Sequence, residues 1–186
     1  MSLVEMIARA DEGALAASGL ACVDRCLPLL GGRDDALRPV WAALDADADW
    51  SAPLAKLRAE VGISGDGQAR TEAADRVRSL LVGVPDVRTE ETLRTWSDGC
   101  SATALLVHRS LDLAGGDVPP EELRRGAEPV GVGPLVAGEL RRQARILEVL
   151  MDHEGVGNGL RRTVGISAEG RRILRAAAAR RARTAG

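Results

Sequence analysis

The segment KLRAEVGISGDG (residues 56–67) has a counterpart in GLRRTVGISAEG (residues 159–170), and both contain the residues VGIS. The two segments agree at 7 of 12 positions, with an offset of 103 residues. A second pair, VDRCLPLLGG (residues 23–32) and VHRSLDLAGG (residues 107–116), agrees at 6 of 10 positions with an offset of 84 residues. Because both pairs occur in the same order along the chain, the sequence predicts a tandem duplication.

The two offsets differ by 19 residues, which predicts an insertion of that length in the second copy. The segment DVPPEELRRGAEPVGVGPL (residues 117–135) is 19 residues long and contains four of the eight prolines. We therefore expect a first helical repeat at residues 1–84 and a second at residues 85–186, with a proline-rich insertion at 117–135.

The composition favours a fold built only of helices. Hydrophobic residues make up 45% of the chain, but aromatic residues make up 2%, with no Phe or Tyr. The core must therefore consist of Leu, Val, Ile and Ala, of which Leu and Ala are strong helix formers. Apolar residues recur at helical spacing in four short segments of each half. Because such a unit cannot bury its apolar stripes alone, we expect an all-α tandem duplication whose two four-helix units pack as one globular body.

Local signals predict where some helices begin and end. Thr89, followed by two Glu residues, predicts a helix start. Gly62 is predicted to end a helix in left-handed geometry, and the second VGIS, around Gly165, is interpreted as the same turn. His108 corresponds to Asp24 of the first copy, which predicts that both lie on a polar face.

Two longer segments around VGIS share an order of elements. VWAALDADADWSAPLAKLRAEVGIS (residues 40–64) and ILEVLMDHEGVGNGLRRTVGIS (residues 146–167) each contain an apolar helix, an acidic turn and a Leu-containing helix. This layout resembles the Clp N-terminal domain, the double four-helix repeat at the front of some AAA+ unfoldases. Neither copy has the Gly-Thr-Glu-His signature that this family places before its second helix. The resemblance implies a module without catalysis that binds peptides, adaptors or small ligands.

A binding site is predicted in the groove between the two repeats, beside the insertion. Prolines stiffen a loop and lower the entropy lost on binding, although the insertion is equally well interpreted as a passive strap. Trp residues are the scarce large surfaces that such a groove uses, and Trp41 is interpreted instead as a core anchor. The predicted ligand-binding residues are Trp50, Trp96, Pro119, Pro120, Pro129 and Pro134. The expected partner is a peptide, a protein or a small molecule.

An alternative function is DNA binding through the C-terminal segment. Residues 121–186 carry a net charge of +5, whereas residues 1–120 carry −7. LRRTVGISAEGRRIL (residues 160–174) is similar to a helix-turn-helix, but Arg161 and Arg171 fall where small or apolar residues normally pack. The residues predicted to contact phosphates in this alternative are Arg171, Arg172, Arg175 and Arg180.

The sequence gives little support for an enzyme, a metal site or a cofactor. Cys22 and Cys26 are four residues apart, but no nearby residue completes a metal site. Cys100 is predicted near a helix start, where a thiol can become reactive, and this is a minor alternative. His153 lies in EVLMDHE (residues 148–154), which lacks the second His of a zinc hydrolase. We expect a non-enzymatic, cytoplasmic protein with no membrane span, no metal and no cofactor.

Overall fold

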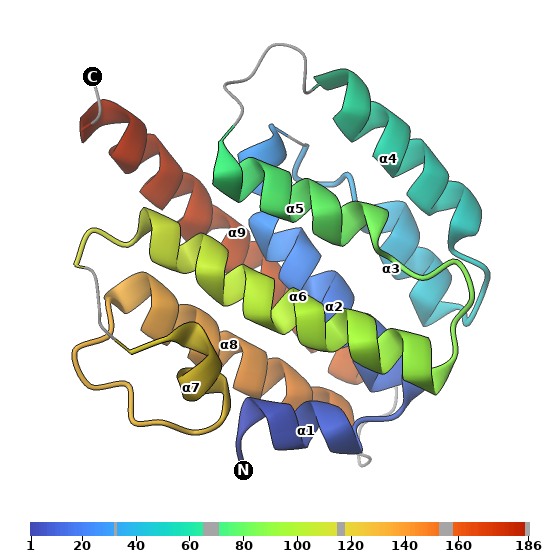
Figure 1. The fold of residues 1–186 in the computed structure, drawn as a ribbon. Helices are drawn as coiled ribbons and strands as arrows, with labels where there is room; N and C mark the ends of the chain where they lie inside the picture. The colour runs from blue at the N-terminus through green and yellow to red at the C-terminus, as the bar shows by residue number, and fades with distance from the viewer. Residues whose placement is uncertain (32, 65–70, 115–117, 153–157, 185–186) are drawn as a thin grey trace.

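The computed structural model describes residues 1–31, 33–64, 71–114, 118–152 and 158–184, and the side chains of 62–64 are not described. These residues form helices and no β-strand, which confirms the predicted all-α class. Figure 1 shows helices packed side by side around a central one. The elements in chain order are α1 Leu3–Arg9, α2 Glu12–Cys26, η1 Leu27–Leu30, α3 Arg38–Asp45, α4 Ser51–Ser64, α5 Glu72–Val82, α6 Glu90–Leu111, α7 Pro120–Arg124, α8 Pro134–Met151 and α9 Asn158–Thr184.

Helix α2 is the centre of the molecule. It begins at the cap Asp11, whose side chain accepts a hydrogen bond from the N–H of Ala14, and every residue from Ala14 to Cys26 is buried. Helices α6, α8 and α9 pack against it (Figure 1). Its small residues allow this close packing, because a Cβ at Gly19 would lie 2.5 Å from the Trp96 ring. Tertiary burial on all sides, and not an amphipathic pattern, defines this helix.

The segment Glu12–Leu30 is long and apolar enough to cross a membrane by length and composition alone. The charged residues Glu12, Asp24 and Arg25 interrupt it, so no uninterrupted apolar run approaches 18 residues. Of an 18-residue window within this segment, 83% is buried inside the protein. A buried core helix passes the same test, so the segment is weak support for a membrane span.

One hydrophobic core connects the two predicted halves. The same cluster of buried residues includes Leu15 and Leu20 of α2, Ile146 of α8 and Leu174 of α9. Helices from both halves therefore bury their apolar sides against each other. The duplication itself stays a prediction, because a shared core does not require a shared origin.

The two VGIS segments lie in different settings. The first forms the last residues of α4, whereas the second lies inside the 27-residue helix α9. The predicted turn at Gly165 is therefore wrong, and so is the helix-turn-helix interpretation of residues 160–174. A glycine inside a helix costs about 1 kcal/mol relative to alanine. The inner face of α9 compensates for this cost by packing against α2 and α8.

The predicted start at Thr89 is confirmed. Its side chain accepts a hydrogen bond from the N–H of Thr92, and the Thr92 hydroxyl accepts one from the N–H of Thr89. This reciprocal capping box fixes the first turn of α6.

Candidate functional site

A groove of about 470 Å³ lies between α3 and α9. Residues from α3 and from the first turns of α9 line it, and they lie more than a hundred positions apart in the chain. Its volume falls in the usual range of about 300–1,000 Å³ for small-ligand sites. The lining residues are Arg38, Trp41, Ala42, Asp45, Leu160, Arg161 and Val164.

Buried polar contacts fix the base of this groove. The Trp41 indole N–H donates to an Asp24 carboxylate oxygen at 3.1 Å, and the Arg171 guanidinium donates to the other oxygen of that carboxylate. Asp24 is 1% exposed, and this burial raises the pKa of its carboxyl above the ordinary value. Because Asp24 lies on α2, Trp41 on α3 and Arg171 on α9, one carboxylate ties together the helices that set the groove's width.

The rim of the groove carries more positive than negative charge. Arg38 and Arg161 are exposed on opposite sides of the groove, and Asp45 lies on the α3 side. The only ion pair of Arg38 that the described residues show is a 3.7 Å contact with Asp35. Exposed ion pairs of this kind contribute little stability, so a ligand carboxylate can replace Asp35.

The predicted tryptophans are core residues. Trp50 is fully buried, Trp96 is 8% exposed, and their rings meet edge to face with centroids 6.2 Å apart. Their indole N–H groups donate to the main-chain oxygens of Pro85 and Leu80, respectively. Neither ring lines the groove between α3 and α9. Trp41 is 7% exposed and belongs to the hydrophobic core, which agrees with its interpretation as a core anchor, and it also borders this groove.

The predicted prolines lie in and around α7, apart from the tryptophan pair. Pro120 is buried at the start of α7, and Pro119 precedes it. Pro129 is exposed in the following loop, and Pro134 begins α8. The structure does not bring these prolines together with Trp50 or Trp96 into one described pocket, so the predicted site stays an untested prediction.

The described part of the insertion, residues 118–135, packs closely on α6 and α8. Arg124 is 2% exposed and donates to the hydroxyl of Ser101 and to the carboxylate of Asp98. A small apolar cluster of Leu105, Leu123 and Val136 lies beneath α7. These contacts make α7 an anchored strap in this structure.

The arginines of the predicted DNA site divide into two groups. Arg171 is ion-paired with Asp24, and Arg175 is ion-paired with Asp34. Arg172 and Arg180 are exposed, and the described residues show no ion pair for either. The partly buried pair of Arg171 with Asp24 therefore holds α9 on the body of the protein, whereas the exposed pair of Arg175 with Asp34 contributes little stability.

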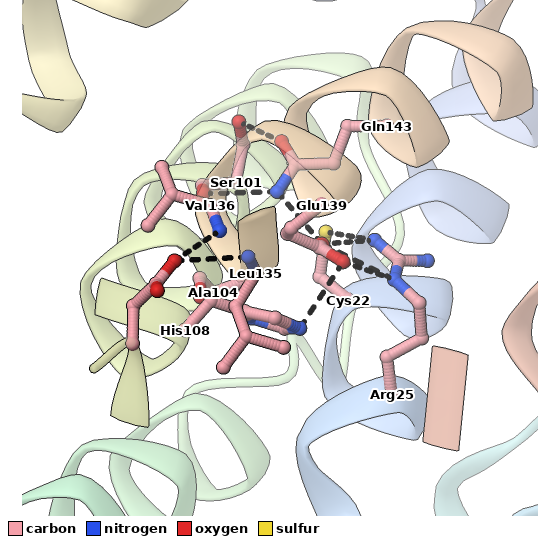
Figure 2. A network of polar contacts seen from close by, with 10 residues as sticks. Cys22, Arg25, Ser101, Ala104, His108, Leu135, Val136, Glu139 and Gln143 are labelled. Carbon is pink, nitrogen blue, oxygen red and sulfur yellow. Dashed lines mark hydrogen bonds and ion pairs between the residues drawn. The ribbon is translucent and has the colours of Figure 1, made fainter. Parts of the chain in front are cut away.

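A buried polar network joins α2, α6 and α8 (Figure 2). Arg25 donates three hydrogen bonds to the Glu139 carboxylate, at 3.1, 2.9 and 2.6 Å, and both side chains are fully buried. Gln143 donates to Glu139 at 2.9 Å and accepts from the Ser101 hydroxyl at 2.6 Å. His108 Nε2 lies 3.5 Å from Glu139. The network therefore fixes the relative positions of three helices.

Burial and ion pairing set the charge states of this network. Burial alone would raise the pKa of Glu139, but the Arg25 guanidinium, together with His108 and the Gln143 amide, outweighs burial, and the pKa falls to about 2. Burial lowers the pKa of His108, although Glu139 opposes this effect. His108 Nδ1 lies 2.7 Å from the carbonyl oxygen of Ala104, so Nδ1 carries the proton of the neutral ring and donates. The prediction that His108 lies on a polar face is wrong, because it is fully buried.

The three cysteines are buried, and this burial favours the protonated thiol over the thiolate. Burial raises the pKa of the Cys22 thiol to about 11 and those of Cys26 and Cys100 well above the ordinary value. Cys100 lies in the middle of α6 and not near its start, which corrects the sequence interpretation. Among the described residues, no group of three or more His, Cys, Asp or Glu could hold a metal ion. His153 and Glu154 of the predicted cluster lie outside the described residues.

Comparisons with protein-family models, curated proteins and solved structures find no match to this chain. The resemblance to the Clp N-terminal domain therefore stays a prediction.

Proposed function

We propose that the protein is a non-enzymatic binding protein that holds a short peptide in the groove between α3 and α9, with an apolar side chain inside and a carboxylate at the rim. The groove itself is the observation that carries this proposal. It lies between helices of the two predicted repeats, as expected for a two-repeat binding module, but the 117–135 insertion does not line it.

The lining of the groove supports an apolar side chain with an acidic neighbour. Ala42, Leu160 and Val164 offer apolar surface, and burial of apolar area contributes about 25 cal/mol per Å². Arg38 and Arg161 frame this surface, and a guanidinium binds a carboxylate through two parallel hydrogen bonds. Asp45 on the same rim can accept a hydrogen bond from a peptide N–H.

The contacts at the base favour a groove that is formed before binding. Trp41 is held by Asp24, which Arg171 also contacts from α9. A groove with a fixed width loses little conformational entropy on binding, which raises affinity.

The test uses a defined peptide and nuclear magnetic resonance. Acetyl-Leu-Glu-Leu-Glu-amide is titrated into the isotope-labelled protein, and acetyl-Leu-Lys-Leu-Lys-amide serves as the opposite-charge comparison. We expect backbone resonances of Ala42, Leu160 and Val164 to shift with the acidic peptide at lower concentration than with the basic one.

Two variants locate the site. Val164→Glu adds a carboxylate to the groove and is expected to weaken binding of the acidic peptide at least tenfold. Val82→Glu makes the same change on α5, where Val82 is 69% exposed, and is expected to leave binding unchanged. The proposed function would be contradicted if no backbone resonance shifted at millimolar peptide, or if both variants lost the same amount of peptide affinity.

A further inference from the structure

The outer face of α9 carries a row of arginines that nothing in the described protein neutralises. Arg161, Arg172 and Arg183 are spaced eleven residues apart, which is about three helical turns, so they project in nearly the same direction. Arg162 and Arg180 are eighteen residues apart, which is five helical turns, so these two side chains share a direction and lie beside this row. All five are exposed, and the described residues show no ion pair for any of them. Together they define the α9 arginine face.

The opposite side of α9 is buried, and the arginines next to it are ion-paired, in contrast to the α9 arginine face. Thr163, Ser167, Gly170, Leu174 and Ala177 are buried against the protein. Arg171 and Arg175, which lie between the two faces, are ion-paired with Asp24 and Asp34. The body of the protein therefore neutralises the arginines that it reaches and leaves the outer ones to solvent.

The length of the face requires an extended anion. From Arg161 to Arg183 the helix rises about 33 Å, at about 1.5 Å per residue. A single phosphate or carboxylate contacts one or two arginines, whereas a nucleic-acid duplex presents one charge per about 1.7 Å of its axis. Glu169 is the one acidic residue of α9, so little repulsion opposes such a partner.

The residues between the arginines distinguish a duplex from other anionic partners. Gly165, Ala176 and Ala179 are exposed on this side of the helix and carry no large apolar group. An interfacial membrane helix needs such groups to insert between lipids, and protein interfaces rely on buried aromatic or aliphatic anchors. The α9 arginine face can therefore bind a partner only through charge, and a polyanion with regularly spaced charges fits it best.

We propose that the α9 arginine face binds the phosphate backbone of duplex nucleic acid without reading its sequence. The acidic body, with a net charge of −7 over residues 1–120, orients the protein so that α9 approaches the duplex first. In Figure 1 the last turns of α9 lie at the upper left edge of the molecule, where a long ligand can reach them. This surface is distinct from the apolar lining of the groove, although Arg161 borders both.

The experiment measures fluorescence anisotropy of a labelled 24-base-pair DNA duplex of arbitrary sequence, with the full chain, between 25 and 200 mM salt. Non-specific binding through phosphates has dissociation constants of about 10⁻⁴–10⁻⁶ M at physiological salt, and each contact adds about −0.9 to the slope of log affinity against log salt. With three to five arginines engaged, we expect a slope of about −3 to −5. A second duplex of different sequence is expected to bind within about twofold of the first.

The matched variants each remove three positive charges. R172A/R180A/R183A removes the arginines of the face that lie away from the groove, and we expect the slope to become less negative by about 3. R9A/R33A/R76A removes arginines exposed on α1, before α3 and on α5, and we expect no change in slope. Five of the six positions lie in helices, where alanine is a strong helix former, and Arg33 is exposed outside the helices, so both variants are expected to keep the wild-type circular dichroism.

Three results would overturn this proposal. The first is no binding to duplex DNA at 25 mM salt, and the second is an equal loss of DNA affinity in the two variants. The third is tighter binding to poly-glutamate or phosphatidylserine vesicles than to DNA. Peptide binding in the groove is measured separately with Val164→Glu, which leaves all arginines in place, so either proposal can fail without the other.

Discussion

Substituting alanine for two glycines of α9, Gly165 and Gly170, tests the helix directly. Gly165 lies inside α9 with open space around the position of a Cβ. Gly170 lies one and a half turns later, on the face that packs against the buried Arg25. The same chemical change therefore meets two different environments in one helix.

The expected magnitudes follow from these surroundings. Alanine stabilises a helix interior by about 1 kcal/mol relative to glycine, so Gly165→Ala should raise the free energy of unfolding by about 0.5–1 kcal/mol. At Gly170 a Cβ would lie 2.8 Å from Arg25 Cγ and closer still to Cδ. Arg25 cannot move aside, because its guanidinium is held by Glu139. Overpacking of this kind costs about 1–3 kcal/mol, so Gly170→Ala should be less stable than Gly165→Ala by about that amount.

Urea denaturation followed by circular dichroism measures both free energies of unfolding. Thermal denaturation adds an independent check, because 1 kcal/mol corresponds to a shift of about 2–4 °C for a domain of this size. If Gly165→Ala destabilises the protein, residue 165 adopts a turn and the continuous helix is wrong. If Gly170→Ala stabilises it as much as Gly165→Ala does, α9 does not pack on Arg25 as described.

Three further predictions concern the buried charges. Arg25→Met should lower the free energy of unfolding by about 3–5 kcal/mol, because it leaves Glu139 buried without its partner. The double variant Arg25→Met/Glu139→Leu should recover much of this loss. Urea denaturation of both variants and of Glu139→Leu alone completes the double-mutant cycle. Stability should fall below about pH 6.5, because His108 binds a proton in the unfolded chain while burial lowers its pKa in the folded protein. Stability should fall again from about pH 4.5 to 2, because Glu139, with its folded pKa of about 2, is then protonated. His108→Asn should remove the first step from a pH series of thermal denaturation curves, and an unchanged step would assign it to other groups. Arg124→Ala should release α7 from α6, so hydrogen exchange should become at least tenfold faster in residues 120–125 and remain unchanged in α2.

The helical class could be predicted because it depends on local properties that sum along the chain. A core of Leu, Val, Ile and Ala without Phe or Tyr favours helices throughout. Thr89 could be identified as a helix start because a capping box involves residues only three apart. The duplication rests on sequence agreement alone, and the fold neither requires nor opposes it.

The candidate site could not be predicted in the same way. Trp41 and Val164 line one groove although 123 positions separate them, and no local pattern records that proximity. Arg25, His108 and Glu139 have ionisable side chains of the kind that sequence patterns normally assign to the surface, yet all three are fully buried. The adjacent charges of Asp24 and Arg25, near the end of a largely apolar helix, were the available signal.

Local sequence patterns are enough to establish that this chain is helical, that one helix begins after Thr89, and that positive charge concentrates in residues 121–186. The tertiary structure decided that the second VGIS continues a helix, that three charged or polar side chains meet in the core, and which arginines of α9 stay in solvent. The physical reason is a difference in scale. A local preference such as that of Gly165 is worth about 1 kcal/mol, whereas a buried ion pair or a packed helix face involves several kcal/mol contributed by residues far apart in the chain.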